Sequence, residues 1–277
     1  MKLRLASVSR YPAPVRILLF LVVLALFWLP IAAPIALLIE NANTVTILTM
    51  SLLFIGFLIW IRIWGRRVHQ EPQIFRAYGL YVSRSNAVEW LVGFSLGAVW
   101  LFSLFLVQSS LGWVVWQPVP NQLLRLLLEG LLSAMGVGLA EGLVFRGWLL
   151  DELARDYRPA VSLGANSLLY AGLHFLKPLP EMIRTFPQFP GLVLLGLALV
   201  WAKRSTQGRL GLSIGLHSGL VFGYYMVNVG EWVSYNPLIP EWLTGIDRNP
   251  LAGAVGLLFL LGMAGLMYWR SQRFARN

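Results

Sequence analysis

Residues Val15–Ile39 read VRILLFLVVLALFWLPIAAPIALLI, a run of twenty-five residues in which Arg16 is the only charge. A helix needs about 20 mostly apolar residues to cross the hydrocarbon core of a bilayer, so this run is long enough. A membrane β-barrel would instead show short segments of alternating polarity. Only helices and closed barrels satisfy every backbone hydrogen bond in lipid, and this sequence therefore favours helices.

The residues before this run are basic, which is also typical of a secretory signal peptide. The apolar run is longer than a signal peptide needs, and it carries Pro30 and Pro34 near its end. We therefore expect a retained membrane helix.

Long apolar runs recur along the whole chain. Of its 277 residues, 57% are hydrophobic and 12% are charged, whereas soluble domains carry about 25% charged residues. A single soluble core cannot hide this much apolar surface from water. We predict an all-α, polytopic bundle of about eight transmembrane helices in a single domain, 1–277. Besides Val15–Ile39, the predicted helices are Thr44–Ile61, Ala87–Val107 with an extension to Trp116 left open, Gln122–Leu150, Ala160–Leu176, Gly191–Ala202, Leu210–Asn228 and Leu251–Trp269.

The net charge of +10 follows from basic residues that flank the apolar segments. If the N-terminus is cytoplasmic and eight helices span, all but four of the 22 Lys and Arg lie on the cytoplasmic side; the four are Arg125, Lys177, Arg184 and Arg248. The positive-inside rule then predicts that both termini are cytoplasmic, although six helices would place them there too. We expect a multi-pass protein of a bacterial-type cytoplasmic membrane, with the lipid bilayer as a partner and no nucleic acid.

Small residues recur every four positions in two of the predicted helices. Such stripes let helices approach closely in lipid, so we expect these two helices at the centre of the bundle. The first stripe comprises Gly130, Ala134, Gly138 and Gly142, and the second comprises Gly211, Gly215, Gly219 and Gly223.

Three ionisable residues interrupt the apolar segments: Glu141, His174 and His217. An ionisable side chain in a membrane helix costs at least about 2.5–3.5 kcal/mol on insertion scales and indicates a functional site. Each residue alone is compatible with a simple hydrogen bond between helices, but one carboxylate and two imidazoles together indicate chemistry. The remaining histidine, His69, lies in a basic loop and is given no role.

These three side chains support two mechanisms for activating a water molecule. In the first, Glu141 acts as a general base while His174 and His217 place the water or stabilise an oxyanion. In the second, all three bind Zn²⁺, which accepts histidine and carboxylate ligands. The zinc-protease motif HExxH is absent, and the chain has no cysteine. The residues alone leave both a membrane enzyme and a transporter open.

Three short segments resemble, in order, the motifs EExxxR, FxxxH and HxxxN of the CPBP family. They are EGLVFRG at Glu141–Gly147, YAGLH at Tyr170–His174 and GLH at Gly215–His217. This family, also called Abi, includes CAAX prenyl endopeptidases and bacteriocin-processing proteins. The resemblance covers about residues 123–223.

The resemblance implies an intramembrane endopeptidase that hydrolyses a peptide bond of a membrane-associated peptide or protein. It places the base that activates water at Glu141, the assisting histidines at His174 and His217, and a positioning arginine at Arg146. It implies both a glutamate-type and a metalloprotease mechanism as alternatives. In the second, Glu141, His174 and His217 are the zinc ligands.

This chain departs from the family motifs at three positions, where Gly142 replaces a glutamate, Tyr170 a phenylalanine and Val221 an asparagine. The changes at Gly142 and Val221 keep a second hypothesis open, a catalytically impaired member that acts as a membrane scaffold or assembly factor. A proton-coupled transporter is a third hypothesis, but no inverted repeat with matched broken helices supports it.

Overall fold

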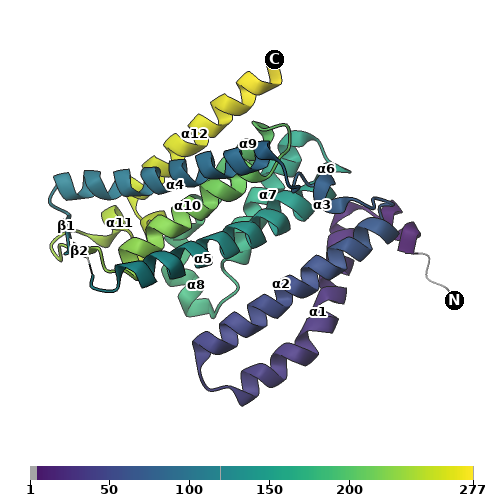
Figure 1. Ribbon diagram of the computed structural model, residues 1–277, viewed down its shortest axis with the longest axis horizontal. Helices are drawn as coiled ribbons and strands as arrows, with labels where there is room; N and C mark the ends of the chain where they lie inside the picture. The colour runs from purple at the N-terminus through teal and green to yellow at the C-terminus, as the bar shows by residue number, and fades with distance from the viewer. Residues whose placement is uncertain (1–4, 119, 277) are drawn as a thin grey trace.

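The computed structural model describes residues 5–118 and 120–276 and confirms an all-α, polytopic bundle (Figure 1). The long helices are α1 (Ala13–Leu38), α2 (Ala42–Arg67), α4 (Arg84–Ser110), α5 (Leu123–Glu141), α7 (Pro159–Leu173), α9 (Phe189–Arg204), α10 (Gly211–Asn228) and α12 (Ala254–Arg276). The short elements are η1 (Leu5–Arg10), α3 (Ile74–Ala77), the π-helical segment η2 (Gly142–Leu149), α6 (Leu150–Ala154), α8 (Leu179–Thr185), η3 (Phe186–Gln188), α11 (Glu241–Thr244), η4 (Ile246–Arg248) and η5 (Pro250–Ala252).

Each of the eight predicted segments is largely helical, and six helical stretches of the described chain are long and apolar enough to cross a membrane. These six are α1, α2, α4, Leu123–Ala154, Leu179–Arg204 and Ala254–Phe274. The other two predicted segments are α7 and α10. With 15 residues, α7 is about 22 Å long, which is shorter than the hydrocarbon core. Most residues of α10 are buried by the surrounding helices.

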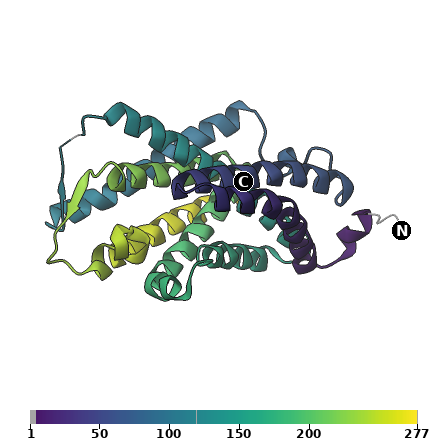
Figure 2. The same ribbon diagram turned by 90° about the horizontal axis from the view of Figure 1, so that it is seen from below.

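The glycine stripe of α10 forms the closest helix contact of the bundle, and its partner is α4. A Cβ atom on Gly215 or Gly219 would collide with the backbone of α4, and one on Gly93 or Gly97 would collide with the backbone of α10. On an adjacent face α10 packs on α5, where a side chain at Gly138 would collide with α10. Figure 1 shows α10 between these helices, and Figure 2 shows the same bundle from below. The stripe on α10 therefore marks a central helix, as predicted. The prediction is wrong for α5, which buries only the small residues Gly130, Ala134 and Gly138 and leaves its other faces exposed or half-buried. The glycines of α4 were not recognised in the sequence.

The extension of the third predicted helix to Trp116 is wrong. Helix α4 ends at Ser110, and Gly112 adopts a φ of 74°, in the left-handed region that ends helices. The N–H of Trp113 then donates to the carbonyl of Gln108, as in a Schellman cap. Strand β1 (Val114–Trp116) follows and pairs antiparallel with β2 (Val233–Tyr235). These two strands join the loops at one end of the bundle.

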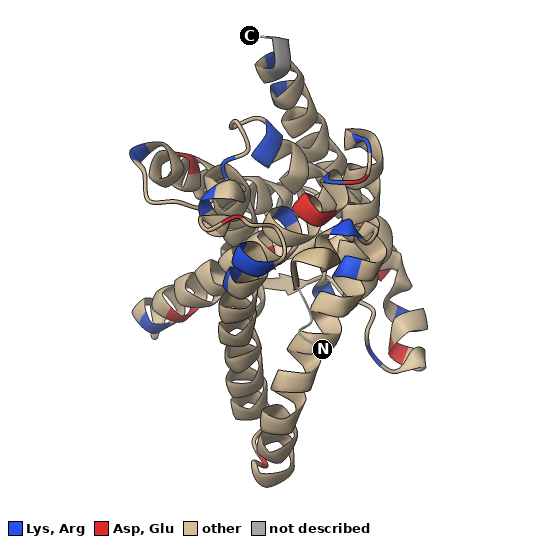
Figure 3. Ribbon diagram, turned by 90° about the vertical axis from the view of Figure 1, so that its right-hand side faces the viewer, with Lys and Arg blue, Asp and Glu red and all other residues tan. Residues whose placement is uncertain are grey.

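Helices α1 and α2 form a hairpin that projects from the other helices in Figure 1. A buried polar cluster ties this hairpin to α6. The carboxylate of Glu152 accepts hydrogen bonds from Arg16 Nε and Trp64 Nε1, both at 2.7 Å, and lies 2.5 Å from His69 Nε2. His69 is thus part of a buried structural contact. Figure 3 views this end of the molecule, where Lys and Arg gather, and the hairpin is nearly free of charge over its length.

Candidate active site

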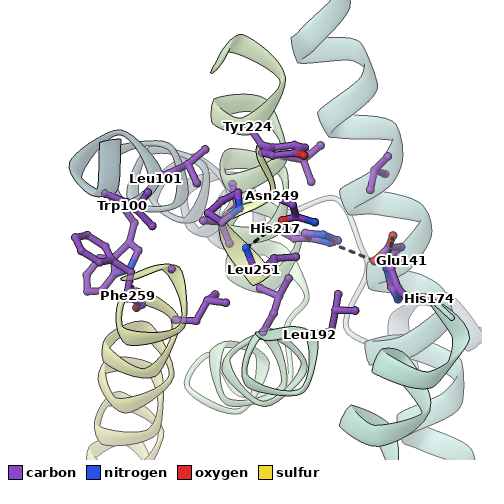
Figure 4. A pocket seen from close by; sticks show the side chains of 18 of the residues that line it. Trp100, Leu101, Glu141, His174, Leu192, His217, Tyr224, Asn249, Leu251 and Phe259 are labelled. Carbon is purple, nitrogen blue, oxygen red and sulfur yellow. Dashed lines mark hydrogen bonds and ion pairs between the residues drawn. The ribbon is translucent and has the colours of Figure 1, made fainter. Parts of the chain in front are cut away.

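The structure brings Glu141, His174 and His217 together from three different helices. Glu141 is the last residue of α5, His174 directly follows α7, and His217 lies within α10. Glu141 Oε1 is 3.9 Å from His174 Nε2, and Glu141 Oε2 is 3.8 Å from His217 Nδ1. The carboxylate therefore lies between two imidazoles, within reach of electrostatic attraction and beyond a direct hydrogen bond (Figure 4).

These three side chains line a cavity of about 230 Å³ whose other walls are mostly apolar. The exposed fraction is 26% for the Glu141 side chain and 34% for His174, but only 6% for His217. Glu141 Oε2 and His217 Nδ1 are buried and have no hydrogen-bond partner among the described residues. A buried polar atom without a partner is costly, so these two atoms are available to a ligand in the cavity.

A backbone contact fixes the orientation of His174. Its Nδ1 lies 2.8 Å from the carbonyl oxygen of Tyr170, one helical turn earlier. A carbonyl can only accept a hydrogen bond, so Nδ1 carries the proton and donates it. The other nitrogen, Nε2, is thereby directed toward the carboxylate of Glu141.

The segment η2 decides where Arg146 lies. In a straight α-helix, five residues turn about 500°, which would place Arg146 about 140° away from Glu141. The i→i+5 bonding of a π-helix instead places residues five apart about one turn from each other, on one side. Arg146 is fully buried, and its guanidinium carbon lies 4.2 Å from the ring centroid of Tyr170. It thus contacts the residue that fixes His174.

Two side chains from neighbouring helices satisfy backbone carbonyls of η2. Asn166 Nδ2 on α7 donates to the carbonyl of Phe145, and Lys203 Nζ on α9 donates to the carbonyl of Arg146, both at 2.7 Å. Wide helical turns are stable in a membrane only where other groups satisfy the backbone, so these two side chains support η2. Neither was recognised in the sequence, where Lys203 was counted only as a flanking charge.

Tyr170 packs against both histidines and so connects the parts of the site. Its ring makes edge contacts with His174 and His217, at centroid distances of 4.7 and 6.5 Å. It also packs edge-on against Phe145 of η2 at 4.9 Å. The resemblance expects an aromatic residue here, and the ring takes the role of a packing surface for the imidazoles.

The other two departures from the family motifs, at Gly142 and Val221, have different surroundings. A Cβ atom at Gly142, the first residue of η2, would lie 2.6 Å from Ile214 Cγ1, so the packing of η2 against α10 leaves no space for a glutamate there. Val221 lies in α10 and lines the cavity. The wall therefore has an apolar side chain where the motif has an amide.

A zinc site at Glu141, His174 and His217 was the alternative prediction. Zinc ligands bind at about 2.0–2.2 Å in a tetrahedron, so their donor atoms lie roughly 3.5 Å or less from each other. Here the two imidazoles approach different carboxylate oxygens at 3.8 and 3.9 Å. Within residues 5–118 and 120–276, no group of three or more His, Cys, Asp or Glu has the arrangement of a metal site. This geometry does not fit a metal ion.

Residues 123–223 match the family model of the type II CAAX prenyl endopeptidases, described as Rce1-like. The matched segment extends from the start of α5 into α10 and contains Glu141, His174 and His217. This match confirms the resemblance to the CPBP family over that segment. No curated protein and no solved structure matches the chain.

Proposed function

We propose that this protein is an intramembrane endopeptidase that hydrolyses a peptide bond of a membrane-associated substrate. One observation carries the proposal: the carboxylate of Glu141 lies between His174 and His217 and faces an apolar cavity within a membrane bundle. The family match supports the same class of reaction. A cavity with one polar end suits a substrate that presents a peptide group beside an apolar chain.

In the proposed reaction, Glu141 takes a proton from water as the water oxygen bonds to the scissile carbonyl carbon. The carbonyl electrons move onto its oxygen, and the tetrahedral intermediate forms. Glu141 then delivers the proton to the leaving nitrogen as the carbon–nitrogen bond breaks. His174 and His217 orient the water and stabilise the developing charge. Arg146 acts as a positioning residue through Tyr170, which it contacts.

The family description names CAAX prenyl endopeptidases, so a lipid-modified CAAX peptide is the first substrate to test. The apolar walls of the cavity, including Trp100, Leu101 and Phe259, are compatible with a lipid-modified or membrane-inserted chain. The first probes are therefore a farnesylated peptide with a C-terminal CAAX sequence and the same peptide without the lipid, followed by transmembrane peptides.

The test is cleavage of these peptides by the purified protein in proteoliposomes, with products identified by mass spectrometry. We expect Glu141→Gln to lower the cleavage rate by about 1,000-fold, because the general base is lost. Glu129→Gln is the matched control on the same helix, outside the cavity. Equal cleavage by wild type and Glu141→Gln contradicts the proposal. Cleavage by neither also contradicts it and favours a non-catalytic membrane scaffold.

A metal-removal experiment separates the two mechanisms that the sequence left open. The distances around Glu141 do not fit zinc, so we expect a strong chelator to leave the cleavage rate unchanged. Metal analysis of the same sample should find no stoichiometric zinc. Loss of activity with the chelator, restored by added Zn²⁺, would assign the reaction to a metalloprotease.

A further inference from the structure

The segment between α11 and α12 reaches the cavity that contains Glu141. Asn249, Pro250 and Leu251 line this cavity, although they lie outside the segment matched by the family model. Figure 4 shows the side chain of Asn249 among the residues that line the same cavity as His217. No sequence pattern had pointed to this residue.

The amide of Asn249 is held in one orientation. Its Oδ1 accepts a hydrogen bond from the backbone N–H of Leu251 at 3.0 Å. Because this contact occupies the oxygen, the Nδ2 group is turned away from it. Nδ2 donates no hydrogen bond to the described residues, and the side chain is only partly buried. An oriented donor without a protein partner therefore lies at the cavity wall.

The backbone before Asn249 is unusual. Asp247 and Arg248 have φ values of 55° and 60°, in the left-handed region that residues other than glycine rarely adopt. Two contacts stabilise this conformation: Arg184 of α8 forms an ion pair with Asp247, and Tyr235 of β2 donates to the carbonyl of Arg248 at 3.3 Å. Strained backbone persists only where its surroundings over-determine it, and it gathers at functional sites.

Two glycines allow the segment to lie directly against the bundle. A Cβ atom on Gly191 of α9 would lie 2.6 Å from the carbonyl oxygen of Leu251, and one on Gly256 of α12 would collide with the carbonyl of Pro250. The backbone on the C-terminal side of Asn249 is thus fixed between two helices. A side chain on such a support can hold a preorganised donor.

We propose that Asn249 is a further catalytic residue, whose Nδ2 group donates a hydrogen bond to the oxyanion of the tetrahedral intermediate. This inference rests on the proposed function. A neutral amide stabilises negative charge without giving up its proton, so it complements a carboxylate that must accept one. Val221, on the same cavity wall, supplies no such donor. Asn249 brings the donor from a segment distant in sequence.

Asn249→Asp keeps an oxygen for the N–H of Leu251 and removes the Nδ2 donor, but its carboxylate also adds a negative charge at the cavity. The neutral variant Asn249→Ser therefore separates the lost donor from the added charge. For Asn249→Asp, we expect kcat for the farnesylated peptide to fall by about 100-fold, with little change in KM. Asn236→Asp is the matched control: Asn236 Oδ1 accepts from the N–H of Leu238 at 3.0 Å in the same manner, but Asn236 lies outside the cavity. This control should retain wild-type kcat. Asn249→Ser, which also keeps an oxygen but lacks the amide, should repeat the loss.

A binding measurement separates catalysis from structure. A phosphinate peptide carries a tetrahedral anion at the scissile position, and a ketomethylene peptide of the same sequence does not. Asn249→Ser, which adds no charge, should weaken binding of the phosphinate by about the factor lost in kcat and leave binding of the ketomethylene peptide unchanged. Equal weakening for both peptides, or a lowered melting temperature that accounts for the lost activity, would show a structural role and overturn the inference.

Different results would contradict the role of Asn249 and the proposed function of the protein. If Asn249→Asp retains wild-type kcat while Glu141→Gln is inactive, the protein is a protease and the role of Asn249 is wrong. If the wild type cleaves no peptide, or if Glu141→Gln cleaves as well as the wild type, the proposed function fails and the role of Asn249 fails with it.

Discussion

Two carboxylates on the stretch Leu123–Ala154 lie on either side of η2, and each faces histidine. Glu152 is fully buried, and its oxygens contact Arg16, Trp64 and His69 at 2.5–2.7 Å. Glu141 is 26% exposed, and its two imidazole neighbours stay at 3.8 and 3.9 Å. The same residue types thus form a closed cluster at one end of η2 and an open one at the other.

The difference between these clusters supports the different roles that we propose for them. The charge of Glu152 is engaged by Arg16, Trp64 and His69, so it holds α1, α2 and α6 together. Glu141 Oε2 is buried without a hydrogen-bond partner among the described residues, and the side chain faces a cavity, so its charge is available to a water or a substrate. A carboxylate beside histidine indicates catalysis only where its partners leave it incomplete.

Replacing Glu152 should have the largest effect on stability. Glu152→Gln leaves Arg16 buried with only part of its negative partners, and removing one member of a buried pair costs about 3–5 kcal/mol. We expect this loss in the free energy of unfolding, measured by denaturant titration in detergent micelles. The kcat per folded molecule should stay close to that of the wild type.

The matched control for this variant is Glu129→Gln, which alters an exposed pair with Arg125 four residues away on the same stretch. Exposed pairs of this kind contribute little, so no measurable change is expected. If Glu152→Gln is as stable as Glu129→Gln, the closed cluster does not hold the hairpin.

Replacing His217 should affect the reaction and leave stability nearly unchanged. His217→Asn removes an imidazole beside Glu141, and we expect kcat to fall by about 100-fold. The counterpart in the closed cluster is His69→Asn, which should lower the melting temperature without lowering kcat per folded molecule. The reverse pattern, a stable but inactive His69→Asn with an active His217→Asn, would contradict the assignment of the two clusters.

Replacing Asn166 tests η2, which lies between the two clusters. We expect a smaller loss of stability than for Glu152→Gln and a smaller loss of kcat than for His217→Asn. Asn166→Ala leaves the carbonyl of Phe145 buried without its donor, which costs about 1–3 kcal/mol. We also expect a several-fold lower kcat, because Arg146 follows directly in η2. A variant with unchanged stability and unchanged kcat would show that Asn166 does not support η2.

The open cluster was predictable from the sequence because lipid makes an ionisable residue costly, so Glu141, His174 and His217 stand out in apolar segments. The closed cluster was not. Glu152 follows a run of apolar residues near a helix end, where charged residues are common, and His69 lies among basic residues. Nothing in their spacing shows that α2 and α6 bring them together.

The position of Arg146 relative to Glu141 could not be predicted from the sequence either. A five-residue spacing has different meanings in an α-helix and in a π-helix, and the run GLVFRGWL has no sequence signal that separates them. Asn249 was missed for another reason, since it reaches the site through a strained segment without helical periodicity. The local sequence pattern predicts the helical bundle and the ionisable residues within it. The contacts that position these residues depend on tertiary packing.

The most direct measurement is cleavage of the farnesylated peptide in water enriched in oxygen-18, by wild type, Glu141→Gln and Glu152→Gln in proteoliposomes. Hydrolysis by an activated water predicts one oxygen-18 atom in the new carboxyl terminus for the wild type and for folded Glu152→Gln. It predicts almost no product for Glu141→Gln. The same labelled product at the same rate from Glu141→Gln would contradict the account.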